Sequence, residues 1–149
     1  MTENKIKEIM LDIGKNARMA SHSVSTLDAK TKNDILFDAS ENLMKNKKKI
    51  LDANSIDIEK NKSKLNTALL DRLLLDENRI ESICKGLIDI SKLEDPVGKI
   101  LSEWSRPNGL KIEKVSVPLG VIGVIYESRP NVAADAAALC LKSGNTLIL

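Results

Sequence analysis

The sequence predicts an α/β chain with a helical amino-terminal half, then a β-hairpin, then one βαβ unit. In the amino-terminal half, apolar residues recur at three- and four-residue spacing, as in amphipathic helices. Next, a turn-forming stretch at 106–109 separates two strand-like segments. Finally, two apolar, mostly β-branched runs, 121–126 and 146–149, flank an Ala- and Leu-rich segment, which is the pattern of parallel strands joined by a helix.

Within the helical half, two helix starts are predicted from capping residues. Asp76 is a good N-cap for the clearest amphipathic helix, whose apolar stripe includes Cys84. Thr31, followed by Asp34, is the predicted start of an earlier helix. The lysine-rich run 45–49 is expected to be a solvated face between two apolar stripes, and a phosphate-binding patch there is the less favoured alternative.

Residues 99–117 are expected to form the hairpin, because Pro and Asn-Gly at 106–109 favour a tight turn. The apolar residues of the second strand change parity between Ile112 and Val115. A bulge, or a change in the face that is covered, would explain this switch.

The βαβ unit begins with 121–126, which is expected to be a strand buried on both faces, as in a parallel sheet. Asn131 occupies the expected N-cap position of a helix over 132–142, and Gly144 is a suitable helix stop. A second buried strand is expected at 146–149.

The polar segment between this strand and helix is the candidate functional site. Ligands of open α/β sheets bind beyond the carboxyl ends of the strands, and 126–131 occupies that place. The segment supplies an acid, a hydroxyl, a guanidinium and an amide, in the order Tyr126, Glu127, Ser128, Arg129, Pro130 and Asn131. An ordinary polar loop with an N-cap Asn is an alternative of similar weight. Glycines 120 and 123 make no dinucleotide fingerprint, because they precede or interrupt the strand.

Composition excludes several other classes of protein. The 149-residue chain has a net charge of only +2 and one each of Trp, Tyr and Phe, which favours neither nucleic-acid binding nor base stacking. No apolar run approaches the roughly 20 residues that cross a bilayer. Residues 1–10 are charged and no apolar h-region follows them, so a secretory signal is not expected. Cys84 and Cys140 are expected to be core thiols of a reduced, cytoplasmic protein. His22, expected in a polar loop, has no metal-ligand spacing around it.

Two long segments resemble the gamma-glutamyl phosphate reductase family of the aldehyde dehydrogenase superfamily. The first is KVSVPLGVIGVIYESRPNVAADAAALCLKSGNTLIL, and the second is LLDRLLLDENRIESICKGLIDISKLEDPVGKI, notably Leu70-Asp71-Arg72-Leu73 and Asp95-Pro96-Val97-Gly98. The resemblance runs over essentially the whole chain, and family members are longer. It implies that residues 1–149 are the amino-terminal part of such an enzyme. They would form an incomplete NADP-binding domain, with the 99–117 hairpin as an oligomerisation element.

The resemblance also implies a reaction. A cysteine thiolate outside this chain attacks gamma-glutamyl phosphate and expels phosphate, and NADPH then reduces the thioester to glutamate-5-semialdehyde for proline biosynthesis. Asn131 is implied as a donor to the developing oxyanion, and N-capping is its alternative role. Arg129 could bind an anionic group of the substrate or pair with Glu127.

Because the nucleophile is absent, the chain alone is expected to be catalytically silent. The alternative to a part of the reductase is a natural short paralogue that does no chemistry and binds a partner subunit through the hairpin.

Overall fold

The computed structural model describes residues 3–127 and 129–149. Its elements in chain order are α1 (Glu3–Val24), α2 (Ala29–Lys45), α3 (Lys47–Asn61), α4 (Thr67–Leu73), α5 (Glu77–Ser91), β1 (Ile100–Ser105), β2 (Lys111–Val115), β3 (Val121–Gly123), α6 (Asn131–Lys142) and β4 (Thr146–Ile148). Helices, hairpin and βαβ unit follow one another as the sequence predicts, which confirms the fold class.

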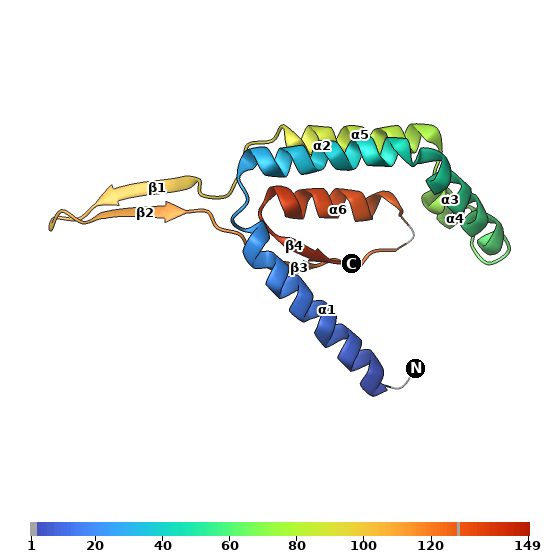
Figure 1. Ribbon diagram of the computed structural model, residues 1–149, viewed down its shortest axis with the longest axis horizontal. Helices are drawn as coiled ribbons and strands as arrows, with labels where there is room; N and C mark the ends of the chain where they lie inside the picture. Colours follow the sequence, from blue (N-terminus) through green and yellow to red (C-terminus); the bar gives the residue numbers. More distant parts are fainter. Residues whose placement is uncertain (1–2, 128) are drawn as a thin grey trace.

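The helices form a layered core. Figure 1 shows α2 and α5 side by side, α6 packed against them, and the β3–β4 pair on the other side of α6. Leu36 of α2, Leu87 of α5 and Ala138 of α6 meet in the apolar core. Cys84 and Cys140 are buried as predicted, and burial raises the pKa of the Cys140 thiol, which keeps it protonated.

Of the two helix caps predicted in the amino-terminal half, one is confirmed and the other is wrong. Asp76 caps α5, since its carboxylate accepts the Arg79 backbone N–H at 2.7 Å. Thr31 does not start α2. The cap is Asp28, whose carboxylate accepts the Thr31 backbone N–H at 2.6 Å, because an N-cap side chain reaches the amide about three residues ahead.

β3 and β4 are parallel and pair Val121 with Thr146, which confirms the βαβ unit. β3 is shorter than predicted, however, and burial of 121–126 on both faces is wrong, since Ile125 is fully exposed. Among the described residues the sheet has only these two strands, so no further strand pairs with β3.

The hairpin is confirmed around the predicted turn, where Gly109 takes a φ of 83°. Its irregularity lies in β1: Ile100 pairs with Val115 and Ser102 with Lys114, so Leu101 is the extra residue of a bulge. The bulge lies opposite the end of β2, where the apolar residues switch from one face of the strand to the other. Figure 1 shows the hairpin projecting away from the helices.

α1 contacts the rest of the chain mainly near its carboxyl end. The Thr146 hydroxyl of β4 donates to the Ala17 carbonyl at 3.1 Å, whereas the amino-terminal part of α1 extends away from the body (Figure 1). His22 lies in the last turn of this helix, and the prediction of a loop there is wrong because α1 continues to Val24.

Within 3–127 and 129–149, no helix combines the length and the apolar composition that a membrane crossing requires. Across the same residues, no three His, Cys, Asp or Glu side chains gather as a metal site would require.

Gly144 ends α6 as predicted, with a φ of 73°. A Cβ at this position would lie 2.8 Å from Pro118 Cγ and 3.1 Å from Val97 Cγ2. We expect Gly144→Ala to lower the free energy of unfolding by about 2–4 kcal/mol, because backbone strain and overpacking add. Gly98→Ala is the matched control: its φ is 78° but its surroundings are open, so about 1–2 kcal/mol is expected. Equal losses in urea denaturation would contradict the role of the close contact.

Candidate functional site

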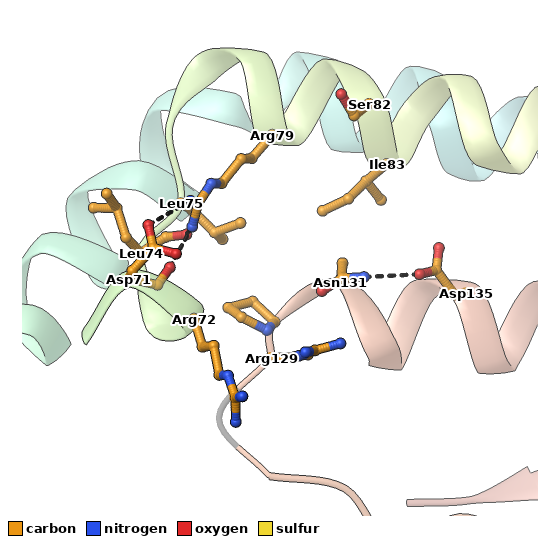
Figure 2. Close-up of a pocket in the computed structure, with 11 residues that line it drawn as sticks. Asp71, Arg72, Leu74, Leu75, Arg79, Ser82, Ile83, Arg129, Asn131 and Asp135 are labelled. Atoms are coloured by element: carbon orange, nitrogen blue, oxygen red, sulfur yellow. Dashed lines mark hydrogen bonds and ion pairs between the residues drawn. The ribbon is translucent and has the colours of Figure 1, made fainter. Parts of the chain in front are cut away.

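A pocket of about 400 Å³ opens where the segment after β3 enters α6. One wall consists of α4, the connection after it and the start of α5, and the other consists of residues 129–131 and Asp135 (Figure 2). The pocket therefore joins the predicted loop to the helical half of the chain.

The structure brings together only some of the residues predicted for the site. Arg129, Pro130 and Asn131 line the pocket, whereas Tyr126 and Glu127 are exposed and do not line it. Ser128 lies outside the described residues.

Asn131 is the first residue of α6, and the prediction that it caps this helix is wrong. Pro130 stands at the N-cap with helical φ and ψ and makes no side-chain capping bond, so the helix starts one residue before the expected position. The Asn131 side chain lies along the helix, and its Nδ2 donates to Asp135 Oδ2 at 2.9 Å (Figure 2). An ionised carboxylate only accepts hydrogen bonds, so Asp135 fixes which end of the amide faces it. The second N–H of Nδ2 is left for another acceptor.

The pocket contains three guanidiniums, and one of them has a structural role. The Arg79 guanidinium donates to the Asp71 carboxylate at 2.7 Å, to the Leu74 carbonyl at 2.8 Å and to the Asp71 carbonyl. These bonds tie α5 to α4 and to the connection between them.

The other two guanidiniums, of Arg72 and Arg129, form no ion pair with any described residue, so the alternative Glu127–Arg129 pair is not seen in this part of the chain.

Sequence reasoning missed Asp71, Arg72, Arg79 and Asp135 as pocket residues. Asp135 had a usable signal, because an acid four residues after Asn131 lies on the same face of a helix. Asp71 and Arg72 stood in a motif of the resemblance, but nothing local linked that motif to the loop before α6.

The parallel βαβ unit, with a polar pocket beside the segment that leaves its first strand, defines an open α/β domain. Comparison with known proteins shows which members of this class the chain resembles. The chain is 50% identical over 145 residues to gamma-glutamyl phosphate reductase of Clostridium tetani, a match that covers 97% of this chain and 34% of the relative. It is also 50% identical to the same enzyme of Paramagnetospirillum magneticum, covering 100% of this chain and 36% of the relative.

Two solved structures agree with the sequence matches. The crystal structure of gamma-glutamyl phosphate reductase from Thermotoga maritima has a TM-score of 0.89 at 40% identity, covering 92% of this chain and 33% of that one. The Saccharomyces cerevisiae enzyme has a TM-score of 0.88 at 40% identity, covering 93% and 35%. No family model matches the chain. The resemblance to gamma-glutamyl phosphate reductases is thus confirmed, and the chain spans about a third of the length of these relatives.

Proposed function

We propose that this chain is the amino-terminal part of a gamma-glutamyl phosphate reductase, an oxidoreductase of proline biosynthesis. The parent enzyme would reduce gamma-glutamyl phosphate to glutamate-5-semialdehyde in the cytoplasm. The observation that carries the proposal is 50% identity to these reductases over nearly the whole chain. The pocket supports it, because it places an amide donor and guanidiniums where an anionic acyl substrate could lie.

In this reaction a thiolate adds to the acyl carbon, and the bond from that carbon to the phosphate oxygen breaks. The two cysteines described here are buried away from the pocket, so we place the nucleophile in the remainder of the parent enzyme. Addition puts negative charge on the former carbonyl oxygen, and the remaining Asn131 N–H is the proposed donor to that oxygen. Asp135 would hold the amide in the orientation that this requires.

Reductase chemistry implies a nicotinamide cofactor, which supplies the hydride when it is bound, and we propose NADPH. β3 and β4 provide the type of sheet edge that such cofactors use, but Gly120 and Gly123 lie before and at the end of β3, so no glycine-rich turn follows it. The described residues therefore do not complete a dinucleotide site. We propose that 126–130 contacts substrate or cofactor in the whole domain. Residues 1–149 would form only a part of that domain.

We also propose that residues 99–117 join copies of the parent enzyme into a homo-oligomer. Support comes from the apolar side chains that β1 and β2 leave exposed, including Leu101 and Trp104 at 55% and 45%. Apolar area of this kind on a projecting hairpin is suited to contact with another subunit.

The isolated 149-residue chain is expected to show no turnover, because the described residues hold no accessible thiol and only two strands of the sheet. The measurement is NADP- and phosphate-dependent oxidation of glutamate-5-semialdehyde, with the complete enzyme as the positive control. Turnover by the chain alone would contradict the proposal. A gene that stops after codon 149, with a product that binds a partner subunit, would favour the non-catalytic paralogue instead.

A further inference from the structure

Arg72 and Arg129 reach the same pocket from parts of the chain that are far apart in sequence. Arg72 lies on α4, and Arg129 lies in the segment just before α6. Figure 2 shows Arg72 extending from α4 toward the segment that bears Arg129. Both side chains belong to exposed residues, so both guanidiniums are accessible to a ligand.

Neither Arg72 nor Arg129 pairs with an acidic side chain in the described part of the pocket. Asp71 is engaged by Arg79, and Asp135 accepts from Asn131. Neighbouring residues on a helix point in different directions, which lets Asp71 turn toward α5 while Arg72 turns toward the Arg129 side. Two like charges at one pocket repel each other, and a bound dianion removes that repulsion.

The chemistry of the proposed substrate identifies the group that fits. A phosphoryl group carries up to two negative charges and accepts parallel hydrogen bonds from guanidinium groups. An α-carboxylate carries one charge and stands beside an ammonium group, which two guanidiniums would repel. In an acyl phosphate the phosphorus is also one bridging oxygen away from the acyl carbon. It must therefore lie close to Asn131 if that residue stabilises the acyl oxygen.

We propose that Arg72 and Arg129 form a two-sided clamp for the phosphoryl group of the substrate. The LDRL segment would then have a divided role, with Asp71 fixing Arg79 and Arg72 binding the ligand. This inference rests on the proposed function, and it assigns the helical half of the chain a direct part in substrate binding.

The reverse reaction tests the clamp, because phosphate and glutamate-5-semialdehyde are then separate substrates. In the complete enzyme, Arg72→Ala is expected to raise KM for phosphate about 10- to 100-fold, the loss of one or two charge-assisted hydrogen bonds, with little change in KM for the semialdehyde. Arg72→Lys should recover part of this loss, because it keeps the charge without the fork. Lys60→Ala, which removes one exposed positive charge from α3, is the matched control and should change neither value.

Arg129→Ala and the double variant separate the possible outcomes. A shared clamp predicts that Arg129→Ala also raises KM for phosphate and that the double variant loses less than the sum of the two effects. If Arg129→Ala raises KM for phosphate and Arg72→Ala does not, the clamp is wrong while the proposed function stands. A rise in KM for the semialdehyde instead would assign the pair to the carboxylate and overturn the inference.

Calorimetry with inorganic phosphate supplies a readout that needs no turnover. Weaker phosphate binding after Arg72→Ala, with an unchanged melting temperature, supports the clamp even if the enzyme proves inactive as a reductase. Equal phosphate affinity in wild type and both arginine variants would overturn the clamp.

Discussion

Asn131→Ala in the complete enzyme is expected to lower kcat by about 10²–10³-fold, which is the usual effect of removing one oxyanion donor. KM should change little, because the hydrogen bond strengthens mainly as charge develops in the transition state. The stability cost should be only about 0.2–0.5 kcal/mol, the value of one i,i+4 pair, since the Asn131 side chain contacts Asp135 and does not cap α6. The measurements are steady-state kinetics and melting temperature on the same preparations.

Asp135 provides the control for this experiment. Asp135→Ala removes the acceptor that orients the Asn131 amide, so it should lower kcat by a smaller factor when Asn131 is present. In an Asn131→Ala background the same change should have no further effect on kcat, because the group that it positions is gone. Normal kcat in Asn131→Ala would rule out the donor role.

Asp95→Ala is expected to cost about 3–5 kcal/mol of unfolding free energy, because it leaves a buried ammonium without its counter-charge. Lys32 is 1% exposed, and its Nζ lies 2.5 Å from Asp95 Oδ2. The Asp95 carboxylate also accepts the Val97 N–H at 2.9 Å, so the turn before the hairpin depends on the same group. Denaturation in urea measures the loss.

A second ion pair offers a matched control for burial. Lys85 and Asp89 on α5 are also 2.5 Å apart, but their side chains are 76% and 50% exposed. Asp89→Ala should therefore lower the unfolding free energy much less than Asp95→Ala does, because water screens the exposed pair. Similar losses in the two variants would show that burial does not set the strength of the Lys32–Asp95 pair.

The Lys32–Asp95 pair also predicts that the stability of the fold depends on pH. Burial opposes ionisation of Asp95, but the hydrogen bonds from Lys32 and Val97 and the charges of Lys32 and Lys142 outweigh it and hold the pKa of Asp95 below its ordinary 3.8. A lowered folded-state pKa gives stability that is present above the unfolded pKa and is lost as pH falls through the folded pKa. Between pH 7 and pH 3, wild type should consequently lose more stability than Asp95→Asn does.

The features that sequence reasoning predicted correctly have local causes. Asp76 starts α5 and Gly144 ends α6 through contacts with residues nearby in the sequence. The Asn-Gly turn of the hairpin depends on its own backbone. Burial of 121–126 was predicted wrongly because burial depends on neighbouring strands that a local pattern does not reveal. The α4 wall of the pocket and the Lys32–Asp95 pair join residues roughly sixty positions apart, and only the packing of α2, α5 and α6 brings them together.

The bond between Thr146 and Ala17 determines when α1 can join the fold during synthesis. The two residues are 129 positions apart, so at 5–20 residues per second the ribosome needs roughly 6 to 26 s to make the chain between them. α2 and α5 can pair before that time. The Ser40 hydroxyl donates a hydrogen bond to the Cys84 carbonyl, and these residues are only 44 positions apart. α1 therefore lacks this anchor on the nascent chain until β4 emerges, and a ribosome-bound chaperone could reach the part of α1 around Ala17 until then.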